Sequence, residues 1–298
     1  MEKTFKVAII GLDTSHAVDF PGLMQDPETP EAQRIGGLRA VGCLRFETPF
    51  QNREGLDKRQ KYLESIGVPV TENFEEATAD CDAVMLEIND PSRHLEYFAK
   101  CALLGKPVFL DKPFADTLEN MQEIIRIARE NKIRFFTSSS LRFDVDFQEG
   151  LAKGPKKPER AVVWGPVGRA PSGSDIIWYG CHAFEMLQTA MGRGAVAVTG
   201  YRDPAGYVFQ VAYRDGRRGT VELAPGSGYG AVLRDRENNG VLVKVNPSYR
   251  MLLENVVRFL KGEDPVALED EVEVMAMLAA ADRSLAENGR GIPVFQLG

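Results

Sequence analysis

A lysine that follows a short apolar run is the first residue whose position suggests chemistry. Val108–Leu110 comes after a Gly-Lys-Pro break, and the run ends in Asp111-Lys112-Pro113. A run of this kind is typical of a buried parallel strand, and ligands of open α/β sheets bind at the carboxyl ends of such strands. A lysine placed there can be held close to a ligand while its ammonium group still meets solvent. A surface lysine at a strand end is the alternative that the tripeptide alone leaves open.

The chain has three histidines, His16, His94 and His182, and histidine is a residue type that can transfer protons. Histidine suits that task because its side chain titrates near neutral pH without a large perturbation. His94 and His182 both stand where a helix is expected to begin. For these two, a capping or satisfied core histidine is the structural alternative to a functional one.

The first strand, turn and helix form the usual binding site for a dinucleotide pyrophosphate. Lys6–Gly11 is a β-branched run, and Ala17–Met24 is expected to form the first helix. Asp13, Thr14 and Ser15 between them are helix N-cap types. In a GxGxxG frame Gly11 fits, but Asp13 replaces the second glycine and His16 the third. Because a carboxylate would repel phosphate, the loop alone favours a helix cap without a nucleotide.

Leu38–Leu44 is expected to be the second strand, near whose end a ribose-binding acid is usual. Cys43 stands at about that position, and Arg45 follows it. A missing acid with an arginine nearby favours the 2′-phosphate of NADP. A solvated surface arginine is an equally ordinary reading, so the sequence leaves NAD and NADP both open.

Strands and helices alternate through the rest of the first half, beginning with an expected helix at Arg53–Ile66 and a short strand at Pro69–Thr71. Asp82–Ile88 is expected to be a buried strand that ends at Asn89-Asp90-Pro91, and His94–Leu104 the helix that follows it. Leu118–Asn131 is an amphipathic helix before a last strand, Ile133–Thr137. This alternation predicts an α/β fold with a Rossmann-type, doubly wound parallel sheet over residues 1–142.

The second half, residues 143–298, no longer alternates strands with helices. Gly154–Pro158 and Pro166–Ser174 are expected to be loops, and Cys181–Met191 a helix. Consecutive strands joined by short turns then indicate a mostly antiparallel sheet, and two helices finish the chain. The expected strands are Ala195–Arg202, Gly206–Arg214, Arg218–Ala224, Gly230–Arg236 and Gly240–Asn246. The sequence thus predicts a C-terminal α+β domain for substrate binding and oligomerisation.

Composition narrows the classes of partner. The 298 residues carry a formal net charge of -7 and no long basic run, so nucleic acid is not expected to bind. The four cysteines are scattered, which predicts neither a zinc site nor a disulfide framework, and no metal-ligand cluster is visible. No apolar stretch is long enough to span a bilayer. Together these features, with an N-terminus that enters a strand directly, predict a cytoplasmic protein without a membrane partner.

The order of these elements resembles the glucose–fructose oxidoreductase and inositol dehydrogenase (Gfo/Idh/MocA) family of NAD(P)-dependent oxidoreductases. The resemblance rests on KVAIIG, a helix that starts at His94, the element GKPVFLDKPFA, the segment Ser140–Asp144, and Tyr179-Gly180-Cys181-His182 at a helix start. It covers nearly the whole chain, and the GK-V-(E/D)KP-A element is its most specific part.

The resemblance implies roles for particular residues. Lys112 corresponds to the lysine that lies beside the nicotinamide and the substrate, and Asp111 replaces the usual glutamate. His182 corresponds to the proton-transfer histidine, and Glu185 matches a further acidic position. The remaining cofactor-binding residues of the implied site are Gly11, Asp13, Thr14, Ser15, His16, Arg45, Asn89 and His94, with Asp111 and Lys112, and its substrate-binding residues are Arg142, Trp178, Tyr179 and Glu185. The structural alternatives are an ion pair for Arg142 and an aromatic core for Trp178 and Tyr179.

The function expected from this resemblance is hydride transfer between NAD or NADP and a sugar, cyclitol or related polyol, in a cleft between the two domains. Two alternatives remain open. One is a lyase or epimerase that uses bound NAD transiently. The other is a non-catalytic ligand-binding or regulatory protein, which the acid at position 13 and Trp178, at a usually acidic position, favour. A sheet with few covering helices also predicts a homodimer or homotetramer formed through its exposed face.

Overall fold

The described chain, residues 3–237 and 239–296 of a computed structural model, divides into two compact units. The first unit takes the chain as far as Ala115, then Glu119–Thr137 and Leu252–Pro265. The second unit takes Asp116–Leu118, Ser138–Met251 and the chain from Val266 onward. Within the described residues, no helix is both long enough and apolar enough to cross a membrane.

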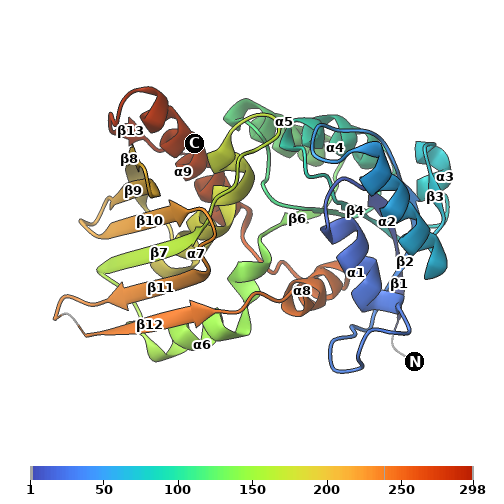
Figure 1. Ribbon diagram of the computed structural model, residues 1–298, viewed down its shortest axis with the longest axis horizontal. Helices are drawn as coiled ribbons and strands as arrows, with labels where there is room; N and C mark the ends of the chain where they lie inside the picture. The colour runs from blue at the N-terminus through green and yellow to red at the C-terminus, as the bar shows by residue number, and fades with distance from the viewer. Residues whose placement is uncertain (1–2, 238, 297–298) are drawn as a thin grey trace. The chain divides into compact units, whose positions relative to one another are not determined.

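The first unit is built on a six-stranded sheet in the order β3-β2-β1-β4-β5-β6, and every neighbouring pair is parallel (Figure 1). Its strands are β1 (Phe5–Ile10), β2 (Leu38–Leu44), β3 (Val70–Thr71), β4 (Ala83–Leu86), β5 (Val108–Leu110) and β6 (Phe135–Thr137). The strand order reverses between β1 and β4, which is the place where α/β sheets open a crevice for a ligand. The predicted doubly wound Rossmann sheet is confirmed.

Helices connect these strands. They are α1 (His16–Gln25), α2 (Arg53–Ser65), α3 (Phe74–Thr78), the 3₁₀ turn η1 (Pro91–Arg93), α4 (His94–Ala102) and α5 (Leu118–Glu130). The periodicity of α5 shows why it forms: Met121, Ile124, Ile125 and Ala128 are buried on one stripe, and its polar residues face outward.

One helix near the C-terminus belongs to the first unit, so the predicted division at residues 142 and 143 does not describe the structure. Helix α8 (Arg250–Leu260) supplies Phe259, whose ring centroid lies 5.7 Å from that of Phe136 in β6. Arg134 donates to the carbonyl of Phe259 (3.0 Å) and pairs with Asp264 (2.8 Å). The sequence shows that α8 has a buried face, but periodicity does not say which sheet that face covers.

The second unit is built on a seven-stranded sheet in the order β12-β11-β7-β10-β9-β8-β13. Its strands are β7 (Arg160–Pro166), β8 (Ala195–Asp203), β9 (Gly206–Tyr213), β10 (Arg218–Ala224), β11 (Tyr229–Arg234), β12 (Gly240–Val245) and β13 (Ile292–Pro293). Strands β7 and β10 are parallel and the other pairs antiparallel, so the predicted mostly antiparallel sheet is confirmed.

Strand β7 lies inside this sheet, although the sequence analysis does not predict it. It is enclosed by proline- and glycine-rich segments, which read as one long irregular stretch. Helix α6 (Val145–Lys153) just before it is also not predicted. The other helical elements are the 3₁₀ turn η2 (Ser140–Phe143), the π-helical turn η3 (Ile176–Gly180), α7 (Cys181–Met191) and α9 (Leu268–Ala286).

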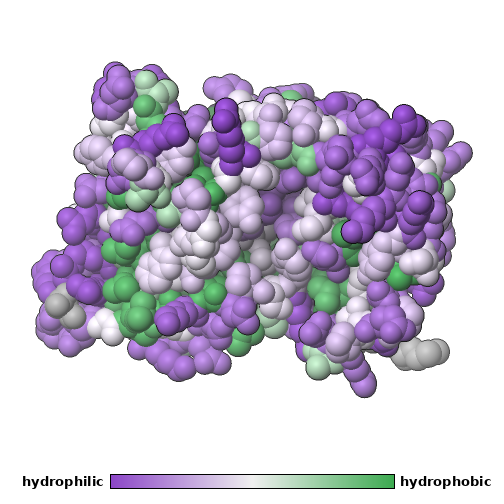
Figure 2. Space-filling view, in the orientation of Figure 1, coloured by the Kyte–Doolittle hydropathy of each residue, from purple (hydrophilic) through white to green (hydrophobic). Residues whose placement is uncertain are grey.

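The seven-stranded sheet has one buried face and one partly exposed face. Helix α7 packs on β7 and β10, and α9 packs on β8. On the opposite face, Val162, Val232 and Leu242 stand side by side on β7, β11 and β12 and keep contact with solvent. Figure 2 shows apolar side chains, in green, over the part of the molecule where Figure 1 places these strands.

The Phe259 ring tests the membership of α8 in the first unit. Phe259→Ala should lower the free energy of unfolding by about 3–5 kcal/mol, because the ring is 1% exposed and its removal leaves a cavity. Hydrogen exchange of the β6 amides should accelerate with it. Leu103→Ala, at a position 80% exposed in the same unit, is the control and should change stability by less than about 0.5 kcal/mol. Unchanged protection of β6 in Phe259→Ala would contradict the packing of α8 on this sheet.

Candidate functional site

Gly11 brings the loop after β1 against the end of β4. Its φ is +109°, a backbone conformation that residues other than glycine rarely adopt. A Cβ atom at this position would lie 2.3 Å from the carbonyl oxygen of Glu87. Glycine is therefore required both by the backbone conformation and by the close approach. The predicted start of a dinucleotide loop at Gly11 has a clear structural reason.

Asp13 faces into the protein. It is 1% exposed, and its carboxylate accepts the backbone N–H groups of Asn89 (2.8 Å) and Asp90 (3.2 Å) and the hydroxyl of Thr48 (2.7 Å). Burial raises the pKa of the Asp13 carboxyl, and these three hydrogen bonds oppose the rise. The acid that takes the place of the second glycine thus joins the loops that follow β1, β2 and β4.

His16 is the first residue of α1, and its ring is buried. Nδ1 lies 2.6 Å from Oδ2 of Asp111, and the ring stacks on Phe20 with centroids 4.9 Å apart. The hydroxyl of Thr14 accepts the backbone N–H of His16 (3.3 Å). Ser15 is the N-cap residue and is exposed, with no hydrogen bond from its side chain to the helix end.

Asp111 and Lys112 directly follow β5, and Glu87 directly follows the neighbouring strand, β4. Glu87 is 0% exposed, and burial, together with the negative charge of Asp111, raises its pKa well above the usual range, while Lys112 opposes the rise. Burial acts to raise the pKa of Asp111 too, but His16 and Lys112 bring it below its ordinary value. Lys112 is 8% exposed and lies within electrostatic reach of both carboxylates.

The structure places the other predicted cofactor residues in local contacts. Arg45 donates to Gln60 (2.6 Å) and Asp57 (2.5 Å) on α2. His94 is 0% exposed, and its Nε2 lies 2.8 Å from the carbonyl oxygen of Ile88, which ties α4 to the end of β4. Asn89 supplies its backbone N–H to Asp13.

His182 of the second unit is held in place by one hydroxyl group and two rings. Its Nδ1 lies 2.7 Å from Oγ of Ser139. The rings of Tyr179 and Tyr229 stand edge-on to it, with centroids 5.4 and 5.8 Å away. His182 is 8% exposed, so it is a positioned ring at the start of α7 rather than a solvated helix cap.

Glu185, one turn after His182, anchors the serine that holds it. It accepts the backbone N–H of Ser139 (2.7 Å), and the Ser138 hydroxyl donates to it in a short hydrogen bond. Arg142 donates from Nε to the same carboxylate (2.9 Å). Arg142 and Glu185, both predicted to bind substrate, therefore engage each other and act on His182 through Ser139.

Two further residues complete this buried network. Arg142 also donates to Gln188 (3.0 Å), and one of its nitrogens lies 3.0 Å from Oε1 of Glu271 on α9. Burial raises the pKa of Glu271 well above the usual range, Glu185 adds to the rise, and Arg142 opposes it. One guanidinium group thus faces two buried carboxyl groups.

Trp178 and Tyr179 lie in the π-helical turn η3 that leads into α7. Their rings meet edge to face, with centroids 5.3 Å apart, and both are half-buried. Burial raises the pKa of Tyr229, and neighbouring Tyr179 contributes to the rise. The two aromatic residues predicted to contact substrate belong to the same aromatic group as His182.

Sequence reasoning missed several members of these two sites: Glu87, Ser139, Gln188, Tyr229 and Glu271. A signal existed for Ser139, because Ser138-Ser139-Ser140 comes directly after β6, at the edge where ligands bind. No comparable signal marks Glu271, which reads as an ordinary acid in the first turn of a helix.

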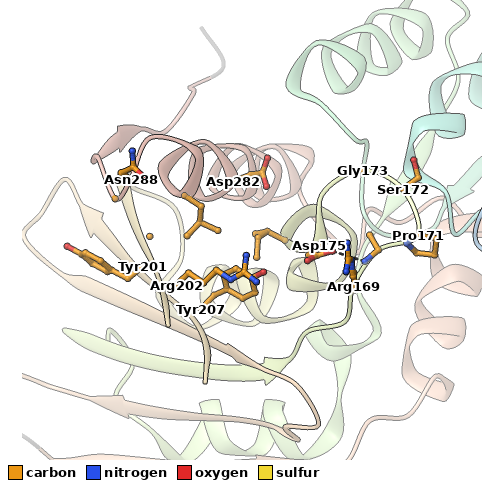
Figure 3. A pocket seen from close by; sticks show the side chains of 15 residues that line it. Arg169, Pro171, Ser172, Gly173, Asp175, Tyr201, Arg202, Tyr207, Asp282 and Asn288 are labelled. Atoms are coloured by element: carbon orange, nitrogen blue, oxygen red, sulfur yellow. Dashed lines mark hydrogen bonds between the residues drawn. The ribbon is translucent and has the colours of Figure 1, made fainter. Parts of the chain in front are cut away.

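A separate open groove of about 780 Å³ lies within the second unit and contains none of these residues. The loop that carries Arg169, strands β8 and β9 with Arg202 and Tyr207, and the end of α9 form it (Figure 3). Its carboxylates serve local structure: Asp175 accepts the N–H of Ala170 (2.7 Å), and Asp282 accepts the hydroxyl of Ser174. The groove therefore does not replace the two sites above as the candidate for chemistry.

Comparison with protein families confirms the predicted resemblance over one segment. Residues 52–139 match the model of the Gfo/Idh/MocA family, which is described as an oxidoreductase family with an NAD-binding Rossmann fold. The matched segment includes Lys112. It begins after the altered loop at Gly11–His16 and ends before His182.

Solved structures share the fold of nearly the whole chain. A myo-inositol 2-dehydrogenase from Lactobacillus plantarum aligns with a TM-score of 0.78 at 16% identity, covering 98% of this chain and 100% of that one. A putative myo-inositol dehydrogenase from Sinorhizobium meliloti gives 0.77 at 16% identity, with coverage of 98% and 100%.

The WlbA dehydrogenase from Bordetella pertussis, solved with NADH and UDP-GlcNAcA, gives 0.73 at 16% identity, with coverage of 99% and 100%. At such identities the likeness establishes the fold. No curated protein matches the sequence.

The buried carboxyl pair in the second unit predicts a pH-dependent stability. The folded-state pKa of Glu271 lies above its ordinary value of 4.5, so the stability that the protonated group contributes below pH 4.5 is lost as the pH rises through the folded-state pKa. Glu271→Gln should match the wild type near pH 4 and be more stable by about 1–3 kcal/mol at pH 8, measured by urea unfolding. Exposed Glu28→Gln is the control. A variant destabilised at pH 8 would contradict this account.

Proposed function

We propose that the protein is an NAD(P)-dependent oxidoreductase that transfers hydride between a nicotinamide cofactor and a sugar, cyclitol or related polyol. The observation that carries the proposal is Lys112. It is a buried lysine at the carboxyl end of β5, inside the segment that matches an oxidoreductase family. Two dehydrogenases that share the fold, one of them putative, are named for myo-inositol.

The residues of the first unit fit a dinucleotide. The phosphate-repelling acid expected from the sequence is turned inward, and three donors satisfy its carboxylate. Gly11 allows the close turn after β1, and the start of α1 at His16 supplies the end of a helix dipole that favours phosphate. The backbone from Thr14 to His16 would hold the pyrophosphate.

The chain's own residues supply the proton chemistry, while a bound nicotinamide supplies the hydride acceptor. Lys112 would orient the substrate hydroxyl and stabilise the charge that develops on its oxygen. His182 would take the proton of that hydroxyl, and Ser139 holds the ring in one orientation through Nδ1. The hydrogen bond from the backbone N–H of Ser139 to Glu185 would fix the position of Ser139 before substrate arrives.

Cofactor titration tests the proposal most simply. Nicotinamide fluorescence of purified protein titrated with NADH and with NADPH should show micromolar binding of at least one of them. The comparison of the two also decides whether Arg45, which is paired with Asp57, contributes to a 2′-phosphate site. No binding of either at millimolar concentration would overturn the enzyme assignment and favour a regulatory protein of the same fold.

Lys112 and His182 should behave as one catalytic unit. Lys112→Met keeps the bulk of the side chain and removes its charge, so it should leave cofactor affinity within a few-fold and lower turnover by roughly two to four orders of magnitude. His182→Ala should do the same and remove the near-neutral limb of the pH–rate profile. The double variant should be little worse than the worse single variant.

The matched control is Lys100→Met, which removes an exposed lysine that pairs with Glu96 and lies over the ring of Tyr97, both in its own helix. Turnover of this control should equal that of the wild type. Turnover of Lys112→Met within threefold of the wild type would remove the main support for the assignment.

We also propose a homodimer formed through the partly exposed face of the seven-stranded sheet. Val162, Val232 and Leu242 are aligned across three adjacent strands, and Leu242 is 60% exposed. A contiguous apolar surface of this kind is typical of an interface. In a two-fold symmetric dimer the same surface of both subunits meets, so a second copy of this chain can cover it. Light scattering should give the mass of a dimer or of a dimer of dimers.

Val232→Glu should dissociate that assembly, because it places a charge at the centre of the apolar row. Leu103→Glu changes an equally apolar and more exposed position in the first unit, and should leave the mass unchanged. A monomeric mass for the wild type in dilute solution would contradict the proposed interface.

A further inference from the structure

Three side chains that are distant in the sequence meet at the carboxyl edge of the first sheet. His16 begins α1, Glu87 follows β4, and Asp111 follows β5. Nδ1 of His16 lies 2.6 Å from Oδ2 of Asp111 and 4.0 Å from Oε2 of Glu87. One potential ligand atom from each residue lies within 4.8 Å of the other two. The sequence analysis sees no ligand cluster because only the fold brings these residues together.

Three of the four carboxylate oxygens in this cluster have no hydrogen-bond partner among the described residues. Glu87 is 0% exposed and Asp111 is 1% exposed. Among the described residues, no donor forms a hydrogen bond with either oxygen of Glu87 or with Oδ1 of Asp111. Buried polar side chains nearly always find a hydrogen-bond partner, and an unpartnered buried carboxylate costs several kcal/mol. Three open acceptor atoms in one small site therefore indicate a missing cationic partner.

Lys112 supplies a positive charge to this cluster but not the missing hydrogen bonds. Its charge favours the ionised forms of Glu87 and Asp111, but the oxygens of Glu87 receive no hydrogen bond from it. Two ionised carboxylates beside a neutral imidazole and one ammonium would leave the site with net negative charge. The cluster reaches the protein surface at His16, whose side chain is 9% exposed.

We propose that His16, Glu87 and Asp111 bind one divalent transition-metal ion, through Nδ1 of the histidine and an oxygen of each acid. An imidazole with two carboxylates suits Mn²⁺, Fe²⁺, Co²⁺ or Zn²⁺ better than Mg²⁺ or Ca²⁺, which prefer oxygen alone. Bonds of about 2.0–2.2 Å place neighbouring ligand atoms roughly 3–3.5 Å apart. The observed separations of 2.6 and 4.0 Å lie on either side of that range, so small side-chain shifts complete the site.

Metal binding requires ligand atoms that carry no proton. Nδ1 of His16 must be unprotonated to accept the metal, and Glu87 must be ionised. The ion takes the place of those protons and satisfies the open oxygens of both acids. Three protein ligands leave further coordination positions for water or for a ligand oxygen.

Metal content and binding test the inference directly. The purified chain is stripped with a chelator, dialysed, and titrated with MnCl₂ and ZnCl₂ by calorimetry, and the bound metal is measured by elemental analysis. The wild type should bind one ion per chain at micromolar or tighter dissociation constant. Its melting temperature should rise by about 5 °C or more when the metal is in hundredfold excess over that constant.

The ligand assignment is tested with Glu87→Gln and His16→Gln, which keep size and remove a ligand atom or charge. Each should weaken binding at least about a hundredfold, because even residues outside the coordination sphere change affinity by about 10–100-fold. The control is Glu273→Gln in the second unit, where a buried acid accepts the N–H groups of Gly194 and Ala195. This control should bind metal like the wild type.

Two results would overturn the inference. One is a stripped wild type that takes up neither ion and shows no thermal shift, which would mean that Lys112 and a proton on Glu87 suffice. The other is Glu87→Gln that binds as tightly as the wild type. Neither result bears on the proposed function, since the titration with NADH and NADPH tests that separately.

Discussion

The hydrogen bonds to Asp13 are the constraint on which the edge of the first sheet depends. One carboxylate joins the loop after β1 to the backbone after β4 and to Thr48 after β2. These three loops border the point where the strand order reverses. A charge that would repel a phosphate instead fixes the geometry of these loops. Because the acid is 1% exposed, its charge is satisfied by the protein rather than presented to a ligand.

In both candidate sites two buried carboxyl groups lie near one lysine or arginine side chain. In the first unit Glu87 and Asp111 share Lys112 and His16, and in the second Glu185 and Glu271 share Arg142. In each pair one acid has a pKa well above its usual range, with burial as the main cause. Such arrangements cost stability and are concentrated at functional sites. They hold Lys112 and His182 in low-dielectric surroundings where charge stabilisation is strong.

The sequence predicts the fold well where each element carries its own signal. The six parallel strands, the helix at Cys181–Met191 and the antiparallel pairing follow from periodicity and turns. Two features do not follow. The partner of α8 is set by tertiary packing against Phe136, and β7 is hidden between irregular segments. Local patterns fix which face of an element is apolar, but not which surface covers it.

The site residues, too, divide into those with a local sequence signal and those brought together only by tertiary contacts. Lys112 and His182 are visible because each lies at a recognisable position in a motif, and both are buried in the structure. Their neighbours Glu87, Ser139 and Glu271 depend on contacts across long sequence distances, which a single sequence does not reveal. His94 and Arg45, predicted beside the cofactor, have local partners in Ile88 and Asp57. The reason is that a polar residue near a strand end serves structure as readily as a ligand.

The central claim is that the altered loop binds a dinucleotide because Asp13 is turned away from the phosphate. The most direct measurement is the dissociation constant of NADH, or of NADPH where that is the tighter ligand, for Asp13→Asn and the wild type at the same ionic strength. Since the charge already faces the protein, its removal should leave affinity within about threefold or lower it by loosening the three loops. A gain of tenfold or more in Asp13→Asn would show that the carboxylate repels the phosphate and would contradict the account.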